Sequence, residues 1–120
     1  MSESFETAEA WKSARALTNE VLFVCRREPL AQDESLRKQL ETAALTMLNC
    51  IANGWESGLV PGKRDAYNEA RACCTDIRSL NYLLFDSRYV SPAEQERLHA
   101  LCVQTGKLIG GLLRGIADRP

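Results

Sequence analysis

Apolar residues recur along most of this chain at the three- and four-residue spacing that is typical of amphipathic helices. The clearest example is the segment 36–55, LRKQLETAALTMLNCIANGW, whose apolar positions are Leu36, Leu40, Ala43, Ala44, Met47, Leu48, Ile51 and Trp55. No segment alternates apolar and polar residues with a period of two over a useful length. The pattern therefore predicts helices and no β-sheet.

Three more segments show the helical spacing, and each break between segments carries residues that end or start a helix. The Glu28-Pro29 pair ends the first segment, because the residue before a proline is disfavoured in a helix. Gly58, Pro61 and Gly62 separate the second segment from the third. The run Ser91-Pro92-Ala93-Glu94 is a capping box with proline at the first helical position.

These boundaries predict four helices, over residues 7–27, 34–56, 63–86 and 92–117, in one domain that spans residues 1–120. Helices of this length joined by short connections favour an all-α fold, an antiparallel up-down-up-down four-helix bundle. The length of 120 residues is sufficient for one hydrophobic core.

Composition and charge narrow the classes of function. The net charge is −1, whereas a protein that binds nucleic acid mainly through phosphate contacts usually carries a basic excess. The N-terminal residues lack the apolar segment of a signal peptide, and no apolar run approaches the length of a membrane span. We therefore expect a cytoplasmic protein that has no membrane partner.

The five cysteines predict free thiols rather than disulfides or a zinc site. Their number is odd, they are widely spaced and no CxxC pair occurs, and each lies on or beside an apolar helical face. A free thiol in such a position behaves as a small hydrophobic group, and this usage fits a reducing compartment. The five are Cys25, Cys50, Cys73, Cys74 and Cys102.

Candidate catalytic and metal sites are weak. A ferritin-like di-metal centre needs Glu-x-x-His on two helices, and this chain has one such match, Glu96 to His99, and one histidine in total. Cys102 lies three residues from His99 on the same helix, but no orienting partner completes a catalytic pair. Gly54, Gly58 and Gly62 match neither nucleotide-binding fingerprint. We predict a protein that is not an enzyme and has no cofactor, metal or small-molecule substrate.

Two surface features suggest function through assembly. Gly106, Gly110, Gly111 and Gly115 all fall inside the last predicted helix, where each glycine costs up to ~1 kcal/mol relative to alanine. That cost suggests close approach by another backbone, from a neighbouring subunit or from the same bundle. Because the last helix is also apolar on more than one side, we favour a subunit contact. The predicted interface residues are Trp11, Trp55, Gly106, Gly110 and Gly111.

Basic pairs near the ends of the predicted helices support an alternative function, nucleic-acid binding. As phosphate contacts they would have to converge in space, within one chain or across subunits. The candidate contacts are Arg26, Arg27, Arg37, Lys38, Lys63 and Arg64.

Several of these positions also match a known family. The stretch 46–54, Thr-Met-Leu-Asn-Cys-Ile-Ala-Asn-Gly, corresponds to a family stretch that ends in Asn-Ile-Ala-Glu-Gly, with Cys50 in place of its asparagine and Asn53 in place of its glutamate. The chain resembles the four-helix-bundle proteins encoded in intervening sequences of bacterial large-subunit ribosomal RNA genes. Further matching positions are Trp11, Ala14, Pro29, Glu34, Leu36 and Gln39.

The resemblance implies a ring-like homopentamer of four-helix bundles with no established enzymatic activity. Residues 76–78 and 105–113 are also similar to the accessory proteins of diversity-generating retroelements, which partner a reverse transcriptase and bind nucleic acid. The resemblance therefore yields two expectations, an oligomeric scaffold whose partner is unknown and, as the alternative, an accessory protein that binds RNA or DNA.

Overall fold

The computed structural model describes residues 4–117, and within this range it contains four long helices and no strand. The helices are α1 (Glu9–Cys25), α2 (Glu34–Glu56), α3 (Val60–Asp86) and α4 (Pro92–Ala117). Short 3-10 turns precede α1 at Phe5–Thr7 and α2 at Leu30–Gln32. The predicted all-α four-helix fold is confirmed.

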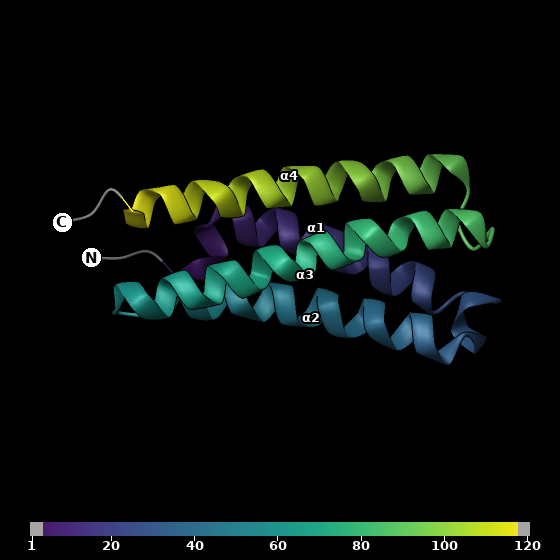
Figure 1. Ribbon diagram of the computed structural model, residues 1–120, viewed down its shortest axis with the longest axis horizontal. Coiled ribbons are helices and arrows are strands. Elements are labelled where there is room, and N and C mark those ends of the chain that lie inside the picture. The colour runs from purple at the N-terminus through teal and green to yellow at the C-terminus, as the bar shows by residue number, and fades with distance from the viewer. Residues whose placement is uncertain (1–3, 118–120) are drawn as a thin grey trace.

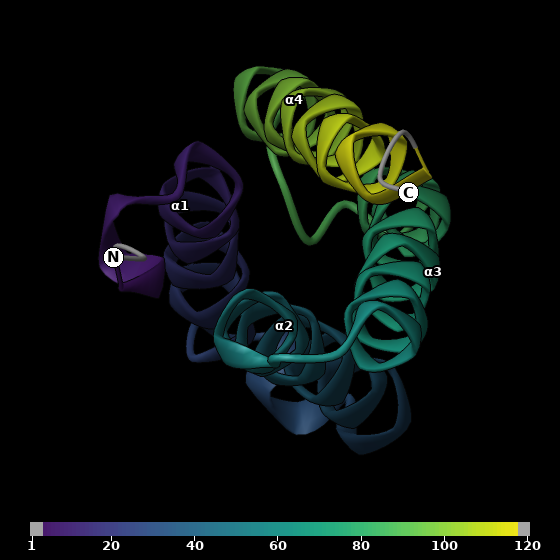
Figure 2. The ribbon, with the colours of Figure 1, turned by 90° about the vertical axis from the view of Figure 1, so that its left-hand side faces the viewer.

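The helices run antiparallel along an elongated bundle that measures 49 × 21 × 20 Å (Figure 1). Each of α1 and α3 packs against both α2 and α4, so α1 and α3 lie diagonally across the bundle (Figure 2). The start of α1, the α2–α3 connection and the end of α4 share one end, which we call the terminal end. The α1–α2 and α3–α4 connections form the opposite, distal end.

Three helix boundaries differ from the sequence prediction, namely the start of α3 and both ends of α1. Helix α3 begins at Val60, three residues before the predicted start, so that Pro61 and Gly62 form its first turn instead of breaking the chain. Proline is tolerated there because its missing N–H would have no partner within the helix. Helix α1 begins at Glu9, because Ala8 has an extended backbone and separates it from the turn at Phe5–Thr7, and it ends at Cys25, two residues before the predicted end.

Side chains and one unusual backbone position fix the other helix ends. Asp33 caps α2 by accepting a hydrogen bond from the Leu36 amide at 3.3 Å. In the capping box of α4, the Ser91 amide donates to Glu94 Oε1 at 2.8 Å and the Glu94 amide donates to Ser91 Oγ at 3.1 Å. Just after the end of α3, Arg88 has a left-handed backbone conformation, at φ 61°. This conformation lets the Tyr89 amide donate a hydrogen bond back to the Leu84 carbonyl.

One hydrophobic core runs along the bundle axis and draws residues from all four helices. Burial of these side chains supplies most of the stability of such a helix bundle. The largest fully buried apolar side chains are Leu17, Val24, Leu30, Leu40, Met47, Ile51, Ile77, Leu98 and Ile109.

Polar contacts hold α1 against α4 along the length of their seam. The buried hydroxyls of Ser13 and Thr105 lie 2.7 Å apart and share a hydrogen bond. Nearer the distal end, Arg97 pairs with Glu20 at 2.6 Å. The way in which α1 packs against α4 is therefore determined by these polar pairs as well as by apolar packing.

Candidate functional site

The predicted interface tryptophans are both half-buried and already have contacts within the chain. The Trp11 ring makes an edge contact with Phe5, with ring centroids 5.0 Å apart, and the Arg15 guanidinium lies 5.8 Å from its centroid. The Trp55 carbonyl accepts a hydrogen bond from Lys63 at 2.9 Å. Their part in a subunit interface stays a prediction.

The glycines of α4 are not explained by close packing inside this bundle. A Cβ atom placed on Gly106 or Gly115 would meet no atom within 4 Å. At Gly110 and Gly111 the atoms that such a Cβ would meet belong to the flexible side chain of Arg114. The alternative that these glycines admit a neighbouring helix of the same chain is therefore wrong, whereas a contact with another molecule stays a prediction.

Several large apolar side chains project from the bundle, with exposed fractions between 44% and 73%. Three of them lie in the last two turns of α3, at the distal end, and a fourth, Phe23, lies near the distal end of α1. None was among the predicted interface residues. These exposed side chains are Phe23, Leu45, Leu59, Tyr82, Leu83 and Phe85.

Most of the predicted phosphate contacts are engaged in bonds within the chain. Arg27 makes a two-pronged ion pair with Glu94, at 2.6 and 2.9 Å, and also donates to the Tyr89 carbonyl at 3.0 Å. Arg37 pairs with Glu41 at 2.9 Å, and Lys38 pairs with Glu34. Lys63 donates to the last carbonyls of α2. Arg26 and Arg64 are exposed and make no ion pair within residues 4–117.

The structure also separates these basic residues. Arg26, Arg27, Arg37 and Lys38 lie at the distal end, whereas Lys63 and Arg64 lie at the terminal end of a bundle 49 Å long (Figure 1). One chain therefore does not gather them into a single patch, and convergence would require several subunits.

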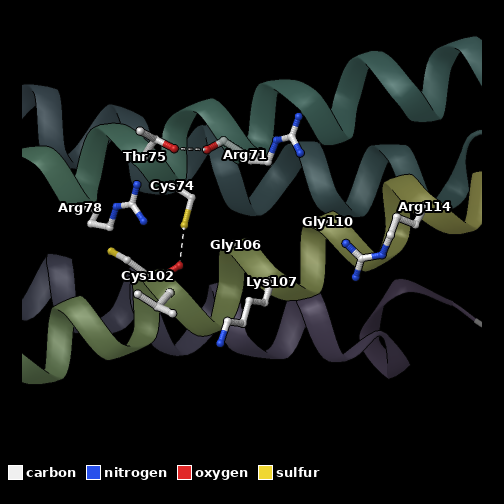
Figure 3. A pocket seen from close by; sticks show the side chains of 10 residues that line it. Arg71, Cys74, Thr75, Arg78, Cys102, Gly106, Lys107, Gly110 and Arg114 are labelled. Carbon is white, nitrogen blue, oxygen red and sulfur yellow. Dashed lines mark hydrogen bonds between the residues drawn. The ribbon is translucent and has the colours of Figure 1, made fainter. Parts of the chain in front are cut away.

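A different group of basic residues does come together, in a groove between α3 and α4 with a volume of about 440 Å³ (Figure 3). Arg78 lies at one end of this α3–α4 groove beside Cys74 and Cys102, and Arg71 and Arg114 lie toward the other end. Lys107 stands along the α4 side. No aspartate or glutamate lines the groove.

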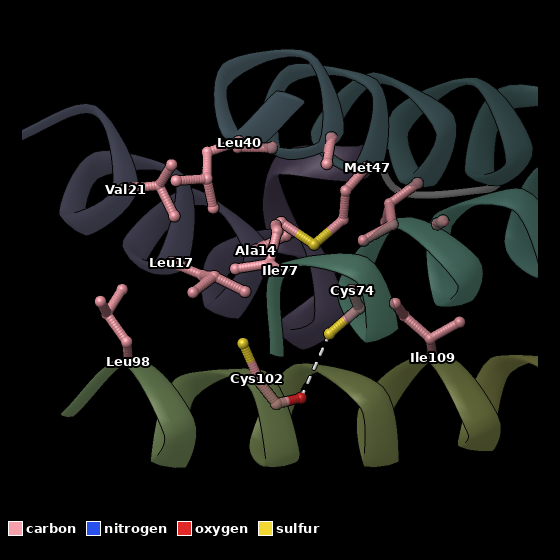
Figure 4. Close-up of a cluster of buried hydrophobic side chains, with 14 of the residues drawn as sticks. Ala14, Leu17, Val21, Leu40, Met47, Cys74, Ile77, Leu98, Cys102 and Ile109 are labelled. Carbon is pink, nitrogen blue, oxygen red and sulfur yellow. Dashed lines mark hydrogen bonds between the residues drawn. The ribbon is translucent and has the colours of Figure 1, made fainter. Parts of the chain in front are cut away.

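The two cysteines at the base of the groove face the core rather than solvent (Figure 4). Cys74 Sγ donates to the Cys102 carbonyl at 3.2 Å. Hydrogen bonding with Cys74 and burial together raise the pKa of Cys102, and the nearby charge of Arg78 only partly opposes this. A thiol with a raised pKa is protonated at neutral pH and is a poor nucleophile.

Two other thiols are also protonated at neutral pH. Burial, with the negative charge of Glu41, raises the pKa of Cys25 to about 11. Burial, with Glu69, raises the pKa of Cys50 to about 11. All five cysteines are free, and the prediction of apolar packing agrees with their positions on or beside the core.

The single histidine, His99, lies on α4 and is partly buried. His99 Nδ1 is buried and has no hydrogen-bond partner, and Glu96 of the same motif is exposed. Among residues 4–117, no three histidine, cysteine, aspartate or glutamate side chains gather in a group that could hold a metal ion. The described helices also include none with the length and apolar character needed to cross a membrane.

The end of α2 contains a close contact that the sequence did not reveal. Gly54 is buried, and a Cβ placed on it would lie 2.6 Å from Cε1 and 2.9 Å from Cδ1 of the Tyr67 ring. Tyr67 is itself 2% exposed, so its ring cannot swing aside into solvent. Glycine is therefore required at this position because α3 packs directly over it.

The stretch that ends in Gly54 is also where the sequence resembles a known family, and a comparison with family models tests whether the chain belongs to it. The model for 23S rRNA-intervening sequence proteins matches residues 6–111, which include all of α1, α2 and α3 and most of α4. The chain belongs to this family. Comparisons with curated proteins and with solved structures give no match.

Membership of the 23S rRNA-intervening sequence protein family agrees with the four-helix structure, and the family is not a known enzyme family. The likeness to accessory proteins of diversity-generating retroelements stays a prediction. For this family member the Gly54–Tyr67 contact gives a structural reason for the glycine that closes the matching stretch.

The α3–α4 groove was not predicted, although the sequence contains a regular spacing of the basic residues that line it. Arg71 and Arg78 are seven residues apart, as are Lys107 and Arg114, so each pair projects from one face of its helix. Which helix faces the other across a seam depends on the packing of the whole bundle. The sequence therefore held the two basic rows but could not show that they line one groove.

Proposed function

We propose that this family member is a non-enzymatic cytoplasmic protein that assembles with copies of itself, as a homopentamer, and acts as a scaffold for another macromolecule. The observation that carries the proposal is the set of large apolar side chains left exposed on the single bundle, six of them at 44–73% exposure. Three of the six, Tyr82, Leu83 and Phe85, lie in the last two turns of α3, and exposed apolar groups that gather in one region mark surfaces of association.

The placement of these side chains suits a ring. Tyr82 and Phe85 lie three residues apart on α3 and share a face, whereas Phe23 lies on α1, diagonally across the bundle. A closed ring with head-to-tail contacts needs two different surfaces on each subunit, one to meet the other on the next copy. We therefore assign the distal parts of α1 and α3 to the two sides of a subunit contact. The number five comes from the family resemblance.

The test is the mass of the purified chain in solution, measured by light scattering at micromolar concentration. We expect about five times the chain mass of 13.4 kDa. A monomeric mass at that concentration would overturn the assembly and the scaffold role with it.

A pair of substitutions tests the proposed surface. Tyr82→Lys combined with Phe85→Lys should reduce the mass toward that of a monomer, because each lysine would place a charge in an apolar contact. The matched control is Leu59→Lys, at an exposed apolar residue of the α2–α3 connection at the terminal end. The control should keep the mass of the unaltered protein.

Nucleic-acid binding remains the alternative function, supported by Arg26 and Arg64, which make no ion pair within the described residues. Assembly into a ring would gather the copies of Arg26 at one end of the bundles and the copies of Arg64 at the other end, so that each end would carry several cations. Retention of an RNA or DNA probe at ~50 mM salt that weakens as salt rises would support this alternative, and no retention at that salt would exclude it.

A further inference from the structure

The α3–α4 groove concentrates positive charge that no carboxylate of the described chain neutralises. Four cationic side chains line it, and none of them takes part in an ion pair within residues 4–117. The chain as a whole has a net charge of −1, so this cluster is local and does not reflect a generally basic surface. The four cations are Arg71, Arg78, Lys107 and Arg114.

The glycines of α4 create the space. Gly106 and Gly110 both line the groove, and a Cβ at Gly106 would stand in open space, with no atom within 4 Å. At Gly110 a Cβ would meet the Arg114 guanidinium at 3.4 Å, so this cation lies over the glycine backbone. The resulting volume of about 440 Å³ falls in the range of pockets that hold small molecules.

The spacing of the cations indicates a ligand with several negative charges. Seven residues along a helix correspond to a rise of about 10 Å, which separates Arg71 from Arg78 and also Lys107 from Arg114. One anionic group cannot reach both ends of such a groove. Three of the four cations are arginines, whose planar guanidinium pairs with phosphate through two parallel hydrogen bonds.

The rest of the groove lining carries no charge. It consists of Cys74, Cys102, Val103, the two glycines and Thr75, whose hydroxyl already donates to the Arg71 carbonyl at 3.2 Å. This surface can accept an uncharged organic group, while the surrounding cations bind the anionic part of the same molecule.

We propose that the α3–α4 groove of this protein binds a small molecule that carries two or more phosphate groups on an uncharged body, of the nucleoside triphosphate class. The proposal concerns binding alone, and the groove lining contains no carboxylate or imidazole that could act as a general base. On α3 the groove lies on the same face as Tyr82 and Phe85, nearer the terminal end of the helix.

Calorimetric titration of the full chain at low salt tests the ligand class. The probes are ATP, inorganic tripolyphosphate and inorganic phosphate. ATP and tripolyphosphate should both bind, ATP the more tightly because its nucleoside covers the uncharged part of the groove lining, and inorganic phosphate should bind at least about tenfold more weakly. Absence of heat with ATP and tripolyphosphate would overturn the proposal, as would equal affinity for inorganic phosphate.

Two kinds of variant test the location. Arg78→Gln combined with Arg114→Gln removes one charge at each end, and should weaken ATP binding about tenfold or more. The matched control is Arg26→Gln combined with Arg64→Gln, which removes two exposed, unpaired charges outside the groove. Equal losses in the two double variants would mean attraction to overall charge only, and would overturn the groove as the site.

The second variant fills the groove without adding or removing charge. Gly106→Leu should abolish ATP binding, whereas Gly115→Leu, at a second open glycine outside the groove, should not change it. The solution mass of Gly106→Leu should equal that of the unaltered protein. A smaller mass would instead assign Gly106 to a subunit contact, as the sequence had suggested, and would overturn the proposal.

A nucleic-acid strand also presents phosphates, and competition separates the two sources. A single-stranded RNA oligonucleotide should not displace bound ATP at equal phosphate concentration. If RNA binds through Arg78 and Arg114 while ATP does not bind, the groove serves nucleic acid and the small-molecule proposal is wrong.

Discussion

Gly54 and Tyr67 form a pair in which the size of one residue limits the other. The Tyr67 ring fills the space directly above the Gly54 backbone, and both residues are buried where α2 meets α3. Lys63 donates to the Gly54 carbonyl at 3.0 Å and fixes the end of α2 at the same place. This site shows most directly how one residue type allows two helices to approach.

We predict that Gly54→Ala destabilises the protein by about 1–2 kcal/mol, because the added methyl group would overlap the buried Tyr67 ring. The loss should occur although alanine favours the helix over glycine by up to ~1 kcal/mol. Urea unfolding followed by circular dichroism measures the change in the free energy of unfolding.

Gly115→Ala is the matched control, since a Cβ at Gly115 meets nothing within 4 Å. This change should stabilise the protein by up to ~1 kcal/mol. If both alanine variants were stabilising, the close contact with Tyr67 would not be the reason for glycine at position 54.

At the scale of elements, an ion pair at the distal end links the residues that follow α1 to the start of α4. The Arg27 guanidinium bonds both oxygens of Glu94, and Glu94 also caps α4 by accepting from the Ser91 amide. The bond to Arg27, together with that from Ser91, lowers the pKa of Glu94 to about 2. One carboxylate thus joins the end of α1 to the start of α4.

This pair predicts a specific dependence of stability on pH. A carboxyl group whose pKa falls on folding stabilises the protein above its unfolded pKa, near 4.5, and the contribution is lost as pH falls toward 2. Glu94→Gln should lower the free energy of unfolding at pH 7 by about 1 kcal/mol, with allowance for the partial exposure of the pair. The difference between the two proteins should shrink between pH 4.5 and pH 2 in urea unfolding experiments.

Glutamine can still accept the Ser91 amide hydrogen bond, so this variant isolates the charge. The control is Glu34→Gln, which removes an exposed partner of Lys38 and should have little effect at any pH. A constant difference between unaltered protein and Glu94→Gln across the acid range would contradict the lowered pKa.

The sequence predicted the elements better than their contacts. Helical spacing and the capping box at Ser91 placed α4 correctly, because both signals act within one turn of the chain. The start of α3 at Val60 was missed, since proline and glycine end some helices and begin others depending on the chain before them. The Gly54–Tyr67 contact could not be predicted, because it depends on how α2 and α3 meet.

At the scale of the whole molecule, contacts between residues far apart in the chain decide which candidate site residues are already paired, and the sequence does not show these contacts. The basic pairs were visible in the sequence, but their carboxylate partners were not: Arg27 finds Glu94, which is 67 residues away. Conversely, the sequence placed Tyr82 and Phe85 inside a predicted helix, and the structure leaves both side chains exposed on its outer side. Apolar spacing identifies a helix and leaves open which part of its surface the other three helices cover.

Assembly of the whole chain predicts a concentration-dependent thermal stability. If the folded state is an oligomer that separates on unfolding, Tm should rise as the total chain concentration rises, by mass action. Thermal scans of the unaltered protein at several concentrations measure this effect. The Tyr82→Lys, Phe85→Lys double variant should show a lower Tm that does not change with concentration. A constant Tm for the unaltered protein would contradict a dissociating oligomer.

The antiparallel arrangement of four helices also gives the bundle a polarity. Because the number of helices is even, the start of α1 and the end of α4 emerge together at the terminal end (Figure 1). In a ring with cyclic symmetry whose axis runs along the bundles, the first turn of α1, the α2–α3 connection and the last turn of α4 of every subunit would lie on one rim. The opposite rim would carry the α1–α2 and α3–α4 connections, so the two rims would offer a partner two chemically different faces.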